Sequence, residues 1–218
     1  MMRGRRIVLQ SAGLALCSAC VTTVPHDYSA YRAHMPRSIL VLPPLNETVD
    51  VEAPYSYLST VSMPLGEAGY YVFPVAVIDA FMKDNGLPTP YEMQSVSLEK
   101  IRQIIGADAV LYVTIEQWGQ KYQILSSNTV VNARARLVDV ATGTTLWEGA
   151  AHAVEGSSGG NDLISALIVA AVEQVIDSTT DRAHDLSRQA NAVMVFNERA
   201  GLLLGPYSPR FDSDNRGR

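Results

Sequence analysis

The chain contains few of the residues that build catalytic or metal centres. Its 218 residues include only two cysteines and four histidines, and the histidines, at positions 26, 34, 152 and 184, are scattered. A structural zinc site needs four ligands at close spacing, so we expect no metal site. A phosphate-binding loop ends in Gly-Lys-Ser or Gly-Lys-Thr, which the glycine-rich segment 156–162 lacks, so we expect no nucleotide and no other cofactor.

An excess of basic residues is also missing. Lysine and arginine number 17 against 22 aspartates and glutamates, for a net charge of −5. Removal of residues 1–19 would take away three arginines and no acid, leaving 14 basic and 22 acidic residues, a net charge of −8. Nucleic acids and anionic lipid surfaces attract basic proteins. The charge therefore argues against both as partners.

No apolar run is long enough to cross a bilayer, which takes about 20 residues. The longest candidate near the N-terminus, residues 7–16, is interrupted by two polar residues. Arginines at positions 3, 5 and 6 precede this run and small residues follow it, which is the pattern of a secretory signal peptide. We therefore expect this segment to be cleaved rather than retained.

The two cysteines, Cys17 and Cys20, lie at the end of this signal. A redox pair would need a thiolate inside a folded domain, and no such pattern surrounds them. Cys20 follows Ser18-Ala19, as the lipid-bearing cysteine of a bacterial lipobox does, although Cys17 stands where that pattern usually has leucine. We expect cleavage before Cys20 and a lipid anchor on it. Val21 gives no inner-membrane retention signal, which favours the periplasmic face of the outer membrane. The alternative to lipidation is ordinary secretion, and the alternative export route is the twin-arginine pathway.

Composition divides the chain into four parts. Residues 1–19 form the signal peptide, and the polar, proline-containing residues 20–37 predict a flexible tether. Residues 38–204 are long enough and apolar enough for one α/β domain. Residues 205–218 contain two prolines and little apolar content, so we expect a disordered tail.

Hydrophobic periodicity and turn residues predict that strands and helices alternate in this domain. The expected strands are 38–42, 70–73, 109–118, 121–126, 129–140 and 145–154. The expected helices are 53–65, 75–85, 98–105, 162–176 and 181–204. Within 129–140, apolar residues alternate with polar ones, so this strand should have one buried and one solvated face. The fold class is α/β, with a mixed sheet flanked by helices.

Three segments of the chain resemble a family of bacterial outer-membrane lipoproteins whose domain has no assigned function. They are PRSILVLPPLN at 36–46, the segment 58–74, and GADAVLYVTIEQWGQKYQ at 106–123. The segment ARLVDVATGTTLWEG at 135–149 is similar to a hairpin of CsgG-like and LpoB-like lipoproteins and of the TolB N-terminal domain. The resemblance implies a fold like the TolB N-terminal domain and a CsgG-like lipoprotein as companion. It implies no reaction.

The hairpin also has a physical interpretation of its own. We expect Asp139 to accept hydrogen bonds from the Ala-Thr-Gly turn that follows it, and Trp147 to bury its ring beside Leu137.

The candidate contact surface consists of prolines and tyrosines, because tyrosine combines apolar area with a polar tip. Its members are Pro43, Pro44, Tyr55, Tyr57, Tyr70 and Tyr71. We expect Phe73 and Tyr112, by contrast, to pack in the core. The sequence thus indicates a lipid-anchored, periplasm-facing accessory protein that binds other envelope proteins and catalyses no reaction. It could also form a homodimer through an edge strand or through these tyrosines.

Two alternatives come from other classes of protein. The letters GSSGG at 156–160 match the G-x-S-x-G nucleophile elbow, which would make the protein a lipid-anchored serine hydrolase centred on Ser158. Only His184 lies downstream as a base, and a flexible loop before a helix explains the same letters. The second alternative is a small-molecule carrier with its cleft near Pro43-Pro44.

Overall fold

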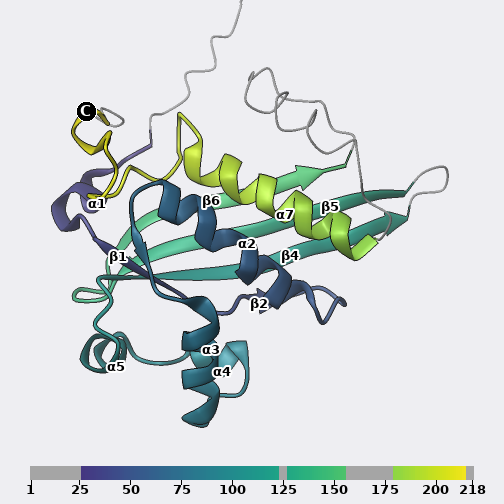
Figure 1. The fold of residues 1–218 in the computed structure, drawn as a ribbon, viewed down its shortest axis with the longest axis horizontal. Helices are drawn as coiled ribbons and strands as arrows, with labels where there is room; N and C mark the ends of the chain where they lie inside the picture. Colours follow the sequence, from purple (N-terminus) through teal and green to yellow (C-terminus); the bar gives the residue numbers. More distant parts are fainter. Residues whose placement is uncertain (1–25, 123–126, 156–178, 215–218) are drawn as a thin grey trace, which may run out of the picture.

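The computed structural model describes residues 26–122, 127–155 and 179–214, which form a mixed sheet flanked by helices (Figure 1). The strands are β1 (Ser38–Val41), β2 (Leu45–Asn46), β3 (Tyr71–Val72), β4 (Ala109–Tyr122), β5 (Ser127–Asp139) and β6 (Thr145–Val154). The α-helices are α1 (Ser29–His34), α2 (Ala53–Glu67), α3 (Val75–Asp84), α4 (Pro90–Gln94), α5 (Leu98–Ile104) and α7 (Thr179–Phe196), and a 3₁₀ helix, η1, spans Phe211–Ser213.

The six strands follow the order β3-β1-β4-β5-β6, and β2 pairs with β4 beyond the end of β1. Strand β1 runs parallel to β3 and β4, whereas β4, β5 and β6 are antiparallel neighbours. This arrangement confirms the predicted single α/β domain with a mixed sheet.

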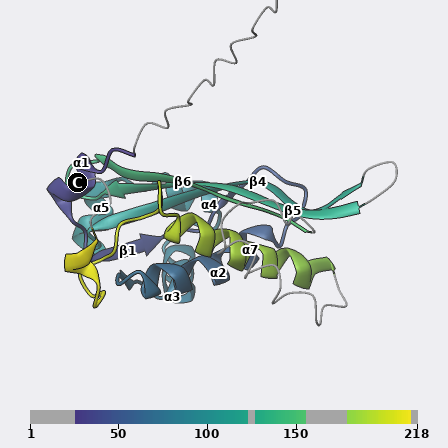
Figure 2. The same cartoon turned by 90° about the horizontal axis from the view of Figure 1, so that it is seen from above.

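Side chains of β1 alternate between two hydrophobic clusters, one on each face of the sheet. Ile39 and Val41 face the larger cluster, which α2 and α7 close from one side (Figures 1 and 2). Leu40 and Leu42 face a smaller cluster built with α3, α4 and α5. The second group of helices covers the sheet only near β1 and the start of β4. The same face of the rest of β4, and of β5 and β6, is therefore left without a covering helix among the described residues.

The hairpin of β5 and β6 forms as the sequence predicts. The Oδ2 atom of Asp139 accepts hydrogen bonds from the backbone N–H of Thr142, at 2.8 Å, and from its hydroxyl, at 2.7 Å. Trp147 lies opposite Leu137 in the register and is buried in the larger cluster, where its indole N–H donates to the carbonyl of Ala200.

The predicted tether extends too far into the chain, because residues 26–37 belong to the folded domain. Helix α1 buries Tyr28 and Tyr31 in the larger cluster. The Tyr28 hydroxyl donates to the carbonyl of Gly201 at 2.6 Å, and the Tyr31 hydroxyl hydrogen-bonds that of Tyr70. Two aromatic rings bury enough apolar area to offset the cost of ordering this short polar segment.

The predicted disordered tail is also corrected for residues 205–214. The backbone N–H of Gly205 donates to the carbonyl of Ala68 at 2.8 Å, and that of Tyr207 donates to Gly69 at 3.0 Å. Gly69 permits this approach because it has a φ of +93° and no side chain; a Cβ there would lie 2.3 Å from the nitrogen of Ser208. The tail therefore packs on the domain beside α1.

Other differences concern the limits of elements. Strand β4 continues to Tyr122, so residues 121–122 extend it instead of starting a separate strand. Helix α7 ends at Phe196, and residues 202–204 pass buried beside the larger cluster without helical structure. Helix α4, which was not predicted from the sequence, begins with a capping box between Thr89 and Glu92. The helix predicted at 162–176 lies outside the described residues.

Candidate functional site

Only two of the six predicted contact residues lie on the surface. Tyr57 is fully buried in α2 and Tyr70 is 5% exposed, because both rings pack in the larger cluster. The two prolines, Pro43 and Pro44, are buried between β1 and β2. Tyr55 and Tyr71 are exposed, at 44% and 51%. The predicted surface therefore does not exist as a unit.

Two predicted functional residues, Cys20 and Ser158, lie outside the described residues. Lipidation of the first and the hydrolase centred on the second stay predictions. His184, the histidine that the hydrolase would use, lies on α7 with its Nδ1 atom 3.1 Å from the hydroxyl of Ser56 on α2. Labelling with a serine-directed fluorophosphonate tests the hydrolase: a labelled wild type beside an unlabelled Ser158→Ala variant would establish it.

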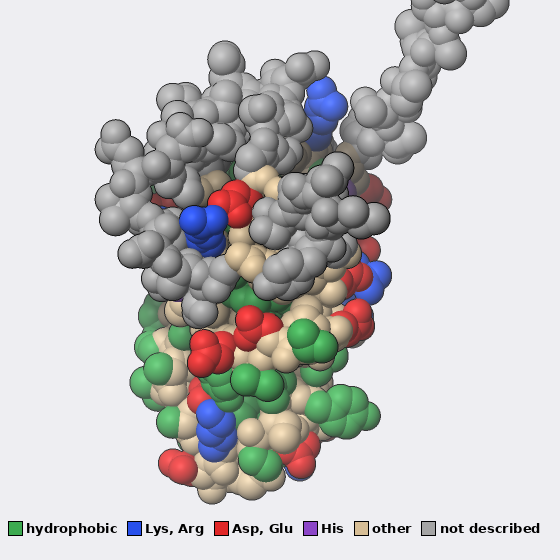
Figure 3. Space-filling model, turned by 90° about the vertical axis from the view of Figure 1, so that its right-hand side faces the viewer, with side chains coloured by type: hydrophobic (Ala, Val, Ile, Leu, Met, Phe, Trp, Pro, Cys, Tyr) green, Lys and Arg blue, Asp and Glu red, His purple; other side chains and the backbone are tan. Residues whose placement is uncertain are grey.

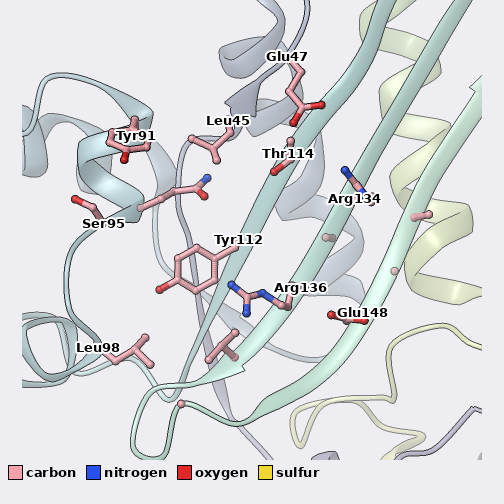
Figure 4. A pocket seen from close by; sticks show the side chains of 16 residues that line it. Leu45, Glu47, Tyr91, Ser95, Leu98, Tyr112, Thr114, Arg134, Arg136 and Glu148 are labelled. Atoms are coloured by element: carbon pink, nitrogen blue, oxygen red, sulfur yellow. The ribbon is translucent and has the colours of Figure 1, made fainter.

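A groove of about 970 Å³ lies on the face of the sheet opposite α2 and α7 (Figure 4). Strands β4, β5 and β6 form its floor, whereas β2, α4 and the start of α5 form its wall. We call this feature the sheet groove. Its principal side chains are Leu45, Glu47, Tyr91, Gln94, Tyr112, Thr114, Arg134, Arg136 and Glu148.

The polar floor follows from the alternation of side chains along β4 and β5. Tyr112 and Thr114 point into the groove, whereas Val113 between them is buried in the larger cluster. In β5, Arg134 and Arg136 line the groove, and Ala135 between them packs in the larger cluster. One face of these strands is thus core, and the other is available for contact.

The wall depends on an interruption of the sheet by Pro43-Pro44. From Val41 to Leu45 the chain takes four steps, whereas β4 opposite them takes three, from Leu111 to Thr114. Proline has no N–H to offer to a neighbouring strand. The side chain of Gln94 on α4 supplies a donor at this point. Its Nε2 donates to the carbonyls of Pro43, at 2.8 Å, and Val113, at 3.2 Å. Gln94 therefore joins α4 to the sheet at the edge of the groove.

Charges of both signs lie across the floor. Arg134 pairs with Glu116 at 2.5 Å, and Glu116 also accepts a hydrogen bond from Asn132 at 3.0 Å. Arg136 places its guanidinium carbon 5.5 Å from the centre of the Tyr112 ring, a cation–π contact, and lies opposite Glu148 on β6. Figure 4 shows Arg136 pointing toward Tyr112, with Glu148 on the neighbouring strand.

The half-buried position of Tyr112 affects its ionisation. Burial raises the pKa of Tyr112 above its usual value, and the charge of Arg136 partly opposes this effect. The hydroxyl therefore remains protonated at neutral pH and can both donate and accept a hydrogen bond.

The sequence predicts the floor of the groove only indirectly. Its prediction that strand 129–140 has one solvated face is correct, and that face carries Arg134 and Arg136. Gln94 and Glu148 were not identified, because neither belongs to a motif that is recognisable in the sequence. Tyr112 and Phe73, both expected in the core, are half-buried and pack against the smaller cluster, and Tyr112 also faces the groove.

Metal-binding clusters and membrane-spanning helices are both absent from the part of the chain that the structure describes. Among residues 26–122, 127–155 and 179–214, no cluster of three or more His, Cys, Asp or Glu side chains is arranged to hold a metal ion. No helix within these ranges has the length and apolar character of a membrane span.

Fold and groove together define a small mixed α/β domain with a polar, tyrosine-containing groove on one face of its sheet. The chain belongs to the family described as "Putative lipoprotein GNA1162-like", which matches residues 26–207. The family match begins at the first described residue, which agrees with the inclusion of α1 in the domain.

Relatives of known sequence or structure support this assignment. The chain is 44% identical over 205 residues to "Putative lipoprotein NMB1124/NMB1162" of Neisseria meningitidis serogroup B, covering 92% of this chain and 95% of the relative. It is also similar to the crystal structure of lipoprotein GNA1162 from Neisseria meningitidis, with 48% identity and a TM-score of 0.54 over 63% of this chain and 95% of that chain.

A more distant match is the C-terminal domain of LpoB from Salmonella enterica. Its identity is 20% and its TM-score 0.39, over 55% of this chain and 83% of that chain. At this level the likeness says nothing about the function of the chain.

Proposed function

We propose that this protein is a lipid-anchored accessory protein of the cell envelope, that it works by binding another envelope protein through the sheet groove, and that it catalyses no reaction. Cys20 carries the lipid, and the domain faces the periplasm from the outer membrane. The observation that carries the proposal is the sheet groove itself: a hollow of about 970 Å³ over a sheet face that no described helix covers.

The side chains of the groove suit a protein partner. Tyrosine and arginine are enriched at the energetic centres of protein interfaces, and here Tyr112 and Arg136 are stacked at the middle of the floor. Arg136 and Glu148 offer opposite charges on adjacent strands. Paired charges of this kind select the orientation of a partner more than they add to its affinity.

The lipid anchor would help the groove to bind its partner. A protein held at a membrane meets other envelope proteins at a high effective concentration, so that a modest affinity is sufficient for binding. The resemblance described above suggests a CsgG-like lipoprotein as the partner, and a second copy of the chain is the other candidate.

Crosslinking in intact cells, followed by affinity purification and mass spectrometry, tests the proposal. Ala150→Trp would fill the groove without removing a polar group, and Arg136→Ser would remove its central cation. Ala80→Trp on α3 and Arg188→Ser on α7 are matched controls, because both residues are exposed and lie outside the groove.

We expect a specific envelope protein to co-purify with the wild type and with both controls. Its yield should fall with either groove variant and with Cys20→Ala. Undiminished recovery with both groove variants would contradict the groove as the contact surface. Recovery of this chain alone would favour self-association.

A small-molecule carrier is the second candidate, because the groove borders Leu45, directly after Pro43-Pro44. A ligand present at 100 times its dissociation constant would stabilise the protein by about 2.7 kcal/mol. Ligand-dependent thermal shifts that disappear in Ala150→Trp would support the carrier and weaken the adaptor.

A further inference from the structure

The proposed anchor allows the domain little distance from its membrane. Only five residues lie between Cys20 and His26, the first described residue, and six extended steps along the chain span about 20 Å. Strand β4 alone has 14 residues and so extends for about 45 Å. The two ends of the domain therefore cannot both lie near the bilayer unless the domain lies flat on it.

Helix α1 cannot lengthen the tether without unfolding part of the domain. Tyr28 and Tyr31 are each 2% exposed and hydrogen-bonded to the residues described above. The helix ends at His34, and the N–H of Met35, the next residue, donates to the carbonyl of Tyr31 at 2.8 Å. The anchor is thus attached to a rigid point at one end of the molecule, where the C-terminal segment also lies (Figures 1 and 2).

This end, formed by α1, Arg37, Arg102 and residues 202–214, we call the α1 end. Met35 is 44% exposed and lies between two hollows. The first, of about 490 Å³, contains Arg37 and Arg102, and the second, of about 140 Å³, contains Arg32 and Phe211. Exposed apolar and aromatic side chains beside arginines are typical of surfaces at the lipid headgroup layer.

The acids of the α1 end are largely occupied by other groups. Asp108 accepts hydrogen bonds from the backbone N–H groups of Arg37, at 2.9 Å, and Ser38, at 3.0 Å. Asp139 accepts a hydrogen bond from the backbone N–H of Thr142 in its turn. Asp214 accepts one from the backbone N–H of Leu204 at 2.8 Å.

By contrast, the guanidinium groups of Arg37 and Arg102 make no ion pair with any residue that the structure describes. They are available to lipid phosphates. Asp212 also borders the second hollow, so the attraction is to individual phosphates and not to a surface of uniform charge.

The opposite end of the domain has a different surface. The loop between β2 and α2 exposes Val49 completely and Val51 to 84%, with Glu47, Asp50 and Glu52 around them. Figure 3 shows acidic and apolar side chains side by side on this end of the molecule. Carboxylates have no favourable contact with lipid phosphates, so this end is suited to face away from the bilayer.

We propose that the α1 end rests on the headgroup layer of the bilayer that holds the anchor, with the loop at Val49 directed away from it. This inference depends on the lipid at Cys20, which supplies the membrane affinity; the acidic net charge of the whole chain therefore does not oppose it. The contact fixes the orientation of the domain and presents the sheet groove at its side to neighbouring envelope proteins.

Site-specific labelling of the lipidated protein tests the orientation. Lipidation uses Cys20, so a cysteine introduced elsewhere is the only free thiol of the mature chain. Met35→Cys and Tyr207→Cys place a fluorophore at the α1 end, and Val49→Cys places it at the opposite end. The labelled proteins are reconstituted into phosphatidylethanolamine vesicles that contain a lipid with a spin label on its headgroup.

We expect the spin-labelled lipid to quench the fluorophores at positions 35 and 207 and to leave that at position 49 unquenched. Equal quenching at all three positions, or stronger quenching at position 49, would overturn the inference. Flotation of the vesicles monitors the anchor separately. If the protein does not float with them, the anchor proposal fails and the orientation with it; if it floats without a difference among labels, only the orientation fails.

Discussion

Substitution of Gly69 by alanine tests whether residues 205–214 are an integral part of the domain. An L-amino acid at the φ of +93° found there costs about 1–2 kcal/mol. The new Cβ would also lie 2.3 Å from the nitrogen of Ser208, so the C-terminal segment must move. Movement breaks the hydrogen bonds of Gly205 and Tyr207 to the chain at 68–69, at about 0.5–1.5 kcal/mol each. The total loss of stability should be about 2–5 kcal/mol.

Gly86 provides a matched control, since its φ is +83° and a Cβ there would meet nothing within 4 Å. Gly86→Ala should cost only the backbone strain of about 1–2 kcal/mol. Urea unfolding of both variants, followed by circular dichroism in a chain carrying Cys20→Ser, gives the two free energies by linear extrapolation. In a chain truncated after Gly205, the two substitutions should cost the same. An equal cost in the full chain would refute the packing of the C-terminal segment.

Two further substitutions test interior polar groups. Gln94→Ala should destabilise the protein by about 1–3 kcal/mol because it removes the hydrogen bonds that Nε2 donates to the carbonyls of Pro43 and Val113; the exposed Gln103→Ala is the control, and equal urea midpoints would contradict the role of Gln94. Tyr57→Phe should leave stability unchanged or raise it, because the buried hydroxyl of Tyr57 has no hydrogen-bond partner among the described residues.

Tyr57→Phe should also change the response to alkali. Burial raises the pKa of Tyr57 far above its ordinary value of 10.0. As the pH rises, the hydroxyl of Tyr57 therefore ionises first in the unfolded chain, which favours unfolding. Below pH 10 the hydroxyl is protonated in both states and has no such effect, and above pH 10 the stability of the folded protein falls. Stability measured from pH 9 to pH 11 should fall less steeply in the variant, and identical slopes would show that Tyr57 does not contribute.

Patterns within one element predicted the fold well. Alternating residues identified β5 and the solvated face of its strand, because one buried face determines the register of a strand. Gly86 and Gly106 correctly marked the ends of α3 and α5, where both glycines adopt positive φ.

Features that depend on distant partners could not be predicted from the sequence. Tyr28 and Tyr31 occur in a polar segment, and only their contacts with residues 70 and 201–203 make that segment ordered. Residues 205–214 lack apolar periodicity, and they are held instead by backbone hydrogen bonds to positions 68 and 69, which leave no pattern in the sequence. For the same reason Tyr57 and Tyr70, which suit an interface as well as a core, were assigned to the surface.

The most direct test of the account is photo-crosslinking from inside the sheet groove in intact cells. A photoreactive amino acid is placed at Ala150, on the exposed floor of the groove, and in a second strain at Ala80, on the exposed surface of α3. The account predicts an adduct with one envelope protein from position 150, dependent on Cys20, and none of that mass from position 80. Absence of an adduct at position 150, or the same adducts at both positions, would contradict binding through the groove.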